Sequence, residues 1–338
     1  MLHEFLARAL ADGDAVVAAL VIETRGSTYR KPGALMLFAS GGARAGLLSG
    51  GCLEGDLQEH AAKMMAGGPA VLERSYDSRG SDDPVWGLGL GCEGLMRIVL
   101  WRLDAGRGRE TLAALLAAER DRTPAALALD ITDGRSVLAT GADDSVGDID
   151  DARLTAAARE ALTRGSAALQ DGLFTLTATR IPTLLVCGAG PDAEPVQRIA
   201  SLLGWQVTVV DHRPAYVDAA RFPGATRVAQ VDTEDPGATV ALDTFDAAVV
   251  MSHHLIADGR YLAALASSRV PYVGLLGPAA RRERLYAELG AMAEALRPRL
   301  RAPIGLDLGG RTPEDIALAI VAEIQATLHG RRGGPFSA

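Results

Sequence analysis

The residues of this chain best suited to chemistry are two cysteines in short glycine-rich segments, forty residues apart. Cys52 lies in Ser-Gly-Gly-Cys-Leu-Glu-Gly at 49–55, and Cys92 lies in Leu-Gly-Cys-Glu-Gly at 90–94. Clustered glycines indicate backbone that turns sharply or that a ligand approaches closely. A helical pattern follows Cys52, and the N–H groups at a helix start favour a thiolate, an effect that the nearby Glu54 weakens.

The spacing of these cysteines argues against a structural zinc site. Structural zinc sites pair ligands two to four residues apart, whereas Cys52 and Cys92 are 40 residues apart with His60 as the only histidine between them. A buried structural thiol at a tight turn is the other alternative, since free cysteine is often buried. We favour a sulfur-centred site in which both thiols face one cavity and hold one ligand. The other residues that we assign to it are Gly50, Gly51 and Glu54.

A cationic segment follows the first strand-like run of the chain. Residues 15–22 are continuously apolar, which predicts a buried strand, and residues 23–33 are rich in turn formers and hydroxyls, which predicts a loop. Guanidinium and ammonium groups at the end of a strand suit an anionic ligand. A solvated surface loop is equally compatible with the pattern. The residues that we assign to anion binding are Arg25, Ser27, Arg30 and Lys31.

The second half begins with the pattern of a dinucleotide-binding unit. An apolar strand at 183–187 runs into Gly-Ala-Gly-Pro-Asp-Ala at 188–193, a helical pattern follows, and a strand at 206–210 ends in Asp211. In such units the glycines let a pyrophosphate approach the helix start, and the acid binds a ribose hydroxyl. Cys187 lies on the first of these strands, which predicts a buried core thiol.

Other polar residues near the ends of these strands bear on whether, and which, nucleotide binds. Arg213 suits a 2′-phosphate, so NAD and NADP both stay open. Asp192 and Glu194 stand at the helix start where a pyrophosphate would rest, and they partly satisfy the helix dipole themselves. His253 and His254 follow a predicted strand, where open α/β sheets bind ligands, although helix capping is an alternative. The residues that we assign to a nucleotide site are Gly188, Gly190, Asp211, Arg213, His253 and His254.

Length and patterning predict two domains. A chain of 338 residues exceeds the usual single domain, and hairpin signals change to strict β–α alternation near residue 181. We therefore expect an α/β protein with an N-terminal α+β domain over residues 1–180. A Rossmann-like doubly wound parallel sheet should follow over residues 181–330, with residues 331–338 as a flexible tail.

Charge and cysteine content exclude several classes of protein. The net charge of −8 argues against a nucleic-acid surface, and the small clusters at 281–282 and 331–332 are interpreted as solvated arginines. Three cysteines make no disulfide framework, and the N-terminus lacks the pattern of a secretory signal. The longest early apolar run is far shorter than a membrane span. We therefore expect a protein of the reducing cytoplasm without a membrane span.

Taken in order, several segments resemble the XdhC/CoxI family of accessory proteins for molybdenum hydroxylases. The resemblance covers nearly the whole chain and rests on the segments at 23–33, 49–55, 90–94, 187–190, 272–277 and 302–309. One departure is Glu93, which stands where the family usually has a glycine after its second cysteine. The other is the pair of acids, Asp192 and Glu194, in the turn that would bind a phosphate.

The resemblance implies a maturation factor, that is, an accessory protein. Family members bind molybdenum cofactor, help it acquire its terminal sulfido ligand and pass it to an apo-hydroxylase of the xanthine or carbon monoxide dehydrogenase type. Here it implies molybdopterin, alone or as a dinucleotide, with Cys52 and Cys92 at the molybdenum and Arg25, Arg30 and Lys31 at the pterin phosphate. The implied partners are an apo molybdenum hydroxylase and a cysteine desulfurase, and we expect a homodimer.

Two other functions stay open. An NAD(P)-dependent oxidoreductase is supported by the Rossmann pattern alone, and His253 or His254 would have to supply its acid or base. A module that senses a nucleotide without carrying a cofactor is the third possibility. What copurifies with the protein distinguishes them: a pterin with molybdenum, a nicotinamide nucleotide, or nothing.

Overall fold

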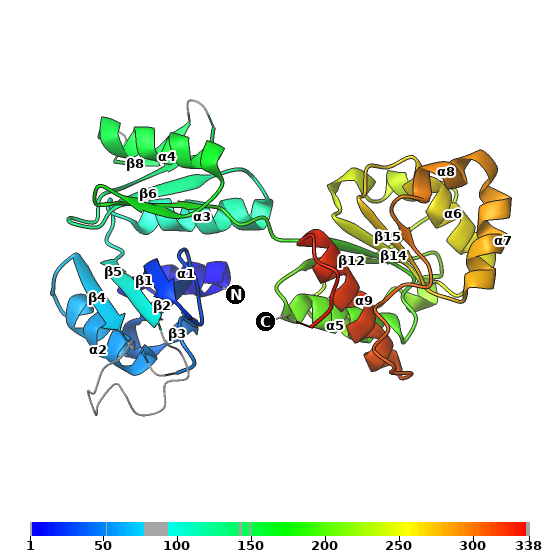
Figure 1. Ribbon diagram of the computed structural model, residues 1–338, viewed down its shortest axis with the longest axis horizontal. Helices are drawn as coiled ribbons and strands as arrows, with labels where there is room; N and C mark the ends of the chain where they lie inside the picture. The colour runs from blue at the N-terminus through cyan, green and yellow to red at the C-terminus, as the bar shows by residue number, and fades with distance from the viewer. Residues whose placement is uncertain (1, 52, 78–93, 142–143, 149, 336–338) are drawn as a thin grey trace. The chain divides into compact units, whose positions relative to one another are not determined.

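The computed structural model describes residues 2–51, 53–77, 94–141, 144–148 and 150–335. The chain divides into two compact units, residues 1–180 and 181–338 (Figure 1). The first unit contains two antiparallel sheets and the second a parallel sheet, which confirms the predicted fold class. Among the described residues, no helix combines the length and the apolar character needed to cross a bilayer.

The first sheet has five antiparallel strands in the order β3-β2-β1-β5-β4. Its central strand β1 is buried on both faces, because Val17 and Val21 belong to the core cluster under α2 while Val16 and Leu20 belong to the cluster on the opposite face. Successive strand residues point to opposite faces, so a strand covered on both sides reads as one apolar run. The elements are α1 (Leu2–Ala11), β1 (Val16–Gly26), β2 (Leu35–Ala39), η1 (Ser40–Gly42), β3 (Arg44–Gly46), α2 (Glu54–Met65), β4 (Val71–Asp77) and β5 (Gly94–Arg102).

Strand β1 is longer than predicted. It continues to Gly26, so the first part of the expected loop, residues 23–26, is strand, and this prediction was wrong. Residues 23–26 pair antiparallel with residues 94–97 of β5 after a register shift between Val21 and Glu23. Pairing with a distant strand outweighs a local composition that is typical of loops.

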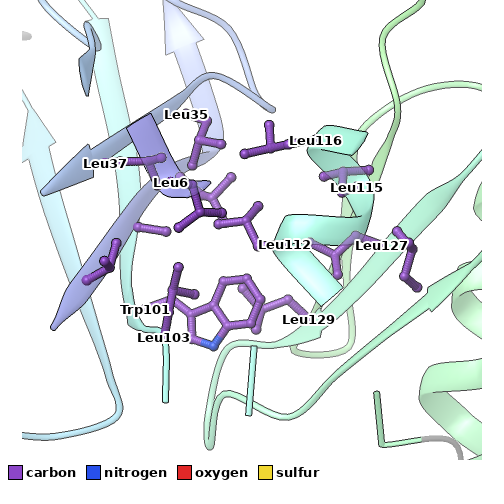
Figure 2. Close-up of a cluster of buried hydrophobic side chains, with 14 of the residues drawn as sticks. Leu6, Leu35, Leu37, Trp101, Leu103, Leu112, Leu115, Leu116, Leu127 and Leu129 are labelled. Carbon is purple, nitrogen blue, oxygen red and sulfur yellow. The ribbon is translucent and has the colours of Figure 1, made fainter. Parts of the chain in front are cut away.

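The second sheet of this unit is also antiparallel and shares a core with the first. α3 packs between them, as Figure 2 shows: Leu112 and Leu115 of α3 lie in one cluster with Leu37 of the first sheet and Leu127 of the second. Leu6 of α1 belongs to the same cluster. One continuous cluster therefore holds the two sheets of this unit together. The sheet has the order β8-β7-β6-β10-β9. Its elements are α3 (Arg109–Asp121), β6 (Ala126–Asp130), β7 (Ser136–Ala139), β8 (Ser145–Gly147), α4 (Ala152–Arg164), β9 (Ala168–Gln170) and β10 (Leu173–Thr177).

The second unit is a six-stranded parallel sheet in the order β13-β12-β11-β14-β15-β16. α5 and α9 cover one face, and α6, α7 and α8 cover the other, so the sheet is doubly wound as predicted (Figure 1). The regular elements are β11 (Thr183–Cys187), α5 (Ala193–Leu202), β12 (Gln206–Asp211), β13 (Arg227–Gln230), β14 (Ala247–Val250), α6 (Leu255–Ala266), β15 (Tyr272–Leu275), α7 (Ala279–Leu289), α8 (Ala293–Leu296), β16 (Leu300–Arg301) and α9 (Pro313–Leu328). Short 3-10 turns are η2 (Pro214–Tyr216), η3 (Ala219–Arg221), η4 (Pro236–Ala238), η5 (Leu242–Thr244) and η6 (Gly290–Met292).

Candidate functional site

The first cysteine segment is built around a buried pair, Ser49 and Glu54. Glu54 is the first residue of α2 and only 3% exposed, and its carboxylate accepts hydrogen bonds from the backbone N–H groups of Leu48 (3.1 Å) and Ser49 (2.7 Å). The Ser49 hydroxyl donates a further short bond of 2.5 Å to Glu54. Burial by itself would raise the pKa of Glu54, but these bonds outweigh it and hold that pKa below its usual range.

The Ser49 hydroxyl also anchors the backbone on either side of position 52. Its oxygen accepts from the N–H groups of Gly51 (3.3 Å) and Leu53 (3.1 Å). Gly51 has a φ of +112°, a conformation that side chains disfavour, and a Cβ atom on Gly50 or Gly51 would meet nothing within 4 Å. Glu54 thus holds this segment through its hydrogen bonds, and its predicted place beside a ligand stays a prediction. Cys52 itself lies outside the described residues.

The second cysteine segment ends at Gly94, where β5 begins next to the cationic segment. Gly94 pairs with Gly26, and a Cβ atom on Gly94 would lie 2.5 Å from the carbonyl oxygen of Ser27 and 2.9 Å from that of Arg25. Only glycine allows such a close approach of two backbones. The structure thus brings the end of the second cysteine segment against the residues predicted to bind an anion. Cys92 and Glu93 lie outside the described residues.

The cationic side chains of this segment differ in what they contact. Arg25, 65% exposed, pairs with Glu23 at 2.9 Å, and Glu23 also accepts from Arg97 of β5 at 2.5 Å. The bonds from Arg97 and then Arg25 lower the pKa of Glu23. Arg30 and Lys31 are exposed and form no ion pair with any residue that the structure describes. Lys31 Nζ donates to Thr28 Oγ1 at 3.4 Å.

Two residues of this region were not assigned from the sequence. Ser49 was interpreted only as part of a glycine-rich turn, and its hydroxyl links both ends of that turn. Arg97 lies between Glu23 and Glu73, with its Nε 2.9 Å from Glu73. An arginine inside an otherwise apolar strand was the available signal for Arg97, since a charged residue in a sheet usually has a partner.

The glycine turn after β11 has the expected backbone. Gly188 has a φ of +127°, and a Cβ atom there would lie 2.5 Å from the carbonyl oxygen of Met251, at the end of β14. Gly190 is buried, and a Cβ atom on it would lie 2.7 Å from Oδ1 of Asp192. The turns after β11 and β14 are therefore in contact at the position where the strand order of the sheet reverses.

The acid at the end of β12 is fully engaged within the chain. Asp211 is 0% exposed, and its carboxylate accepts from the backbone N–H groups of Ala189 (2.7 Å) and Arg213 (2.9 Å) and from the Arg213 guanidinium (2.8 and 2.9 Å). Burial would raise the pKa of Asp211, and the Arg213 and Ala189 bonds more than offset this and lower it. The Arg213 guanidinium also lies 3.8 Å from the ring centre of Tyr216.

The two histidines after β14 have different surroundings. His253 has a left-handed backbone (φ 58°), and its Nε2 lies 2.6 Å from Oδ2 of Asp192. His254 caps α6, since its Nδ1 accepts from the N–H of Ala257 at 3.2 Å. The capping alternative weighed for these histidines thus applies to His254. His254 lies beside His212, with ring centres 5.6 Å apart, and burial lowers the pKa of His212.

Cys187, the last residue of β11, and Arg281 of α7 are both held inside the second unit. Cys187 is buried as predicted, and burial raises the pKa of its thiol, so it is an unreactive core residue. Arg281 was interpreted as solvated, and that was wrong: its guanidinium donates to Asp258, which is 0% exposed. A long-range partner on α6 gives this arginine a structural role.

The described residues, which include neither Cys52 nor Cys92, contain no group of three or more His, Cys, Asp or Glu suited to a metal ion.

Comparisons with known proteins cover both units. Residues 9–77 match the XdhC and CoxI family, and residues 184–324 match the XdhC Rossmann domain. A Bacillus subtilis protein named as a probable xanthine dehydrogenase subunit is 32% identical over 96% of this chain and 97% of its own length. The Escherichia coli molybdenum cofactor insertion chaperone PaoD is 25% identical over 95% of this chain and 86% of its own length.

A solved structure supports the same relationship over the whole chain. The crystal structure of a protein described as a xanthine dehydrogenase from Bacillus halodurans superposes with a TM-score of 0.81 and 27% identity, covering 98% of this chain and 96% of the other. The match includes both the unit that carries the cysteine segments and the Rossmann unit. With a relative 32% identical along nearly its whole length and the two domain matches in their expected order, the chain belongs to the XdhC and CoxI family.

Proposed function

We propose that this protein binds molybdenum cofactor, assists the acquisition of its terminal sulfido ligand and inserts it into a molybdenum hydroxylase of the xanthine dehydrogenase type. The observation that supports this most is the contact of Gly94 with the segment 25–28, which places the end of the second cysteine segment beside exposed cationic side chains. The family, and the insertion chaperone among its relatives, support an accessory role.

The described residues fit such a cargo. Arg30 and Lys31 are exposed and form no ion pair among the described residues, so they suit a phosphate, and Ser27 is exposed beside them. A Cβ atom on Gly50 or Gly51 would meet no neighbour, which leaves room for a large ligand beside the first cysteine segment. Leu53, next to Cys52, and Met96, at the start of β5, pack in one buried cluster. This favours our proposal that Cys52 and Cys92 serve one cavity.

Each part of the chain would have a defined task. The bound cofactor supplies the molybdenum centre that accepts the sulfur. The thiolates of Cys52 and Cys92 would contact that centre as soft ligands, and Arg25, Arg30 and Lys31 would hold the phosphate. Ser49 and Glu54 would hold the first cysteine segment in a ligand-ready conformation, so that little ordering is needed on binding. We further propose that the protein acts in the cytoplasm as a homodimer, with an apo-hydroxylase and a cysteine desulfurase as partners.

The test measures cargo and transfer separately. Wild-type protein and the variants Cys52→Ser and Cys92→Ser are made in a host that synthesises the cofactor, and molybdenum and pterin are measured per chain. Each variant is then mixed with an apo-hydroxylase whose activity reports insertion. We expect both variants to fold and to lose most of the bound molybdenum. Cys187→Ala is the matched control, because Cys187 is a buried core thiol of the other unit. Equal molybdenum in all four proteins would contradict the proposal.

An NAD(P)-dependent oxidoreductase is less well supported. The Rossmann sheet favours it, but the acid expected to bind a ribose is buried and accepts four hydrogen bonds from its own chain. A carboxylate offers about four acceptor positions, so none is left for a ribose unless Arg213 moves.

A further inference from the structure

The crevice at the strand-order reversal is where a Rossmann domain would bind a dinucleotide, and here two turns line it. One follows β11 and contains Gly188 and Gly190; the other follows β14 and contains His253. In a nucleotide-binding domain the side-chain-free position in the first turn lets a pyrophosphate approach the backbone and the helix start. Whatever fills the space in front of these glycines therefore decides whether a pyrophosphate can bind there.

In this chain the occupant is the carboxylate of Asp192. Its Oδ1 lies where a Cβ atom on Gly190 would come within 2.7 Å, and its Oδ2 lies 2.6 Å from Nε2 of His253. Asp192 is mostly shielded, at 23% exposed, whereas the His253 side chain is 61% exposed. The acid thus stands in front of the glycine and is held there by a residue of the opposite turn.

Two other groups that could bind an anion here, the Ala189 N–H and the Arg221 guanidinium, are engaged by acids of the chain. The N–H of Ala189 donates to Asp211, and the carbonyl of Ala189 accepts from Arg221 at 3.1 Å. Arg221 also forms a two-pronged contact with Glu194, at 2.7 and 3.0 Å. Three acids of the chain therefore take up the donors and cations that a dinucleotide would otherwise use.

We propose that Asp192, held by His253, is a specificity-determining residue that excludes diphosphate-bearing nucleotides from the glycine turn. A phosphate entering the turn would meet a carboxylate at close range, and the like charges repel. It would also have to break the Asp192–His253 contact before it reached Gly190. The domain retains the Rossmann fold while its phosphate position is occupied by its own side chain.

The experiment is a gain of binding. Calorimetric titration with NAD, NADP and inorganic pyrophosphate compares the wild-type protein with Asp192→Asn, which removes the charge, and Asp192→Gly, which removes the side chain. We expect weak or undetectable binding to the wild type and at least a tenfold gain in affinity for one of these ligands in at least one variant. Asp243→Asn is the matched control, since Asp243 is an acid of the same unit that pairs with Arg269 and precedes β14, whereas His253 follows it. It should show no gain.

Each outcome decides the inference. Tight binding of NAD or NADP by the wild type would overturn it, because Asp192 would then be no barrier. Folded Asp192 variants that gain nothing would overturn it as well, because something other than Asp192 would close the turn. A thermal unfolding scan establishes that the variants are folded. If one of the two Asp192 variants does not fold, the other still tests the inference. The proposed cofactor function is tested separately, since molybdenum retention should be the same in the Asp192 variants and the wild type.

Discussion

Gly94 and Ser27 approach so closely that a Cβ atom on Gly94 would lie 2.5 Å from the Ser27 carbonyl oxygen. This contact joins the end of one motif to the middle of another that is separated from it by more than sixty residues of chain. Both are parts of the proposed cargo site, and neither motif alone indicates that they meet. The contact and the buried Ser49–Glu54 pair of the first cysteine segment therefore both hold the proposed cargo site in shape.

The Gly94–Ser27 contact predicts that Gly94→Ala destabilises the first unit. The added methyl group would force the β1 and β5 backbones apart, and overpacking typically costs about 1–3 kcal/mol. Urea unfolding measures this cost, and molybdenum retention should fall with it. Gly55→Ala is the control, because Gly55 is in α2 and its Cβ would meet nothing within 4 Å. There alanine should add about 0.5–1 kcal/mol of stability. Equal effects at the two positions would contradict this interpretation.

The Ser49–Glu54 pair predicts a pH-dependent contribution to stability. Glu54 has a lowered pKa in the folded chain, so its stabilising contribution is complete above the unfolded glutamate pKa of about 4.3. It is lost as the pH falls through the lower, folded pKa. Glu54→Gln should therefore cost about 1–3 kcal/mol at pH 7, because it disturbs buried donors.

The measurement is the free energy of unfolding of the wild type and Glu54→Gln between pH 7 and pH 3. The difference between them should shrink in the acid part of this range. Ser49→Ala serves as a second variant, since it removes the hydroxyl that bonds Gly51, Leu53 and Glu54. A difference that stays constant across the range would show that the Glu54 charge is not what stabilises the segment.

The exposed cations predict an effect on cargo without an effect on folding. Replacing both Arg30 and Lys31 with Ala should change stability by no more than about 0.5 kcal/mol, as is usual for surface positions. Molybdenum retention should fall about tenfold or more, because one hydrogen bond to a charged group contributes about 1.5–3 kcal/mol. The paired control replaces Arg331 and Arg332, two exposed arginines of the other unit. Similar retention in both double variants would argue against a phosphate at residues 30–31.

Much of the fold was predictable because local signals agreed with it. The apolar run at 15–22 is the buried centre of β1. The start of α9 likewise has a local signal: Thr312 accepts from the N–H of Asp315, Asp315 accepts from that of Thr312, and Pro313 is the first helical residue. Helix caps and strand periodicity depend on residues a few positions apart, so they can be recognised in a single sequence.

The parts that were missed depend on partners distant in the chain. Residues 23–26 are strand because β5 lies beside them, and the local composition contains no trace of β5. Arg281 is held by Asp258, 23 residues earlier on another helix, so its isolated pattern could not show its role. The two cysteines were chosen from their glycine-rich surroundings, and the cavity proposed for them remains a prediction for the experiments above.

The two glycines of the turn after β11 should respond differently to the same substitution. At Gly188 a Cβ atom would lie 2.5 Å from the backbone oxygen of Met251, and its φ of +127° disfavours any side chain. Gly188→Ala should therefore cost about 2 kcal/mol or more, from backbone strain and overpacking together. At Gly190 φ is not in the left-handed region, and the nearest atom is Oδ1 of the Asp192 side chain, which can rotate.

Gly190→Ala should consequently change the free energy of unfolding by no more than about 1 kcal/mol, since Asp192 can yield by a change of rotamer. Its effect should appear elsewhere, as a weakened Asp192–His253 contact. The measurement combines urea unfolding of both variants with NMR observation of the His253 ring, whose resonances should move in Gly190→Ala and in Asp192→Asn alike. If Gly190→Ala proved as destabilising as Gly188→Ala, the space in front of Gly190 would be closed by rigid backbone, and the Asp192 side chain could not be its movable occupant.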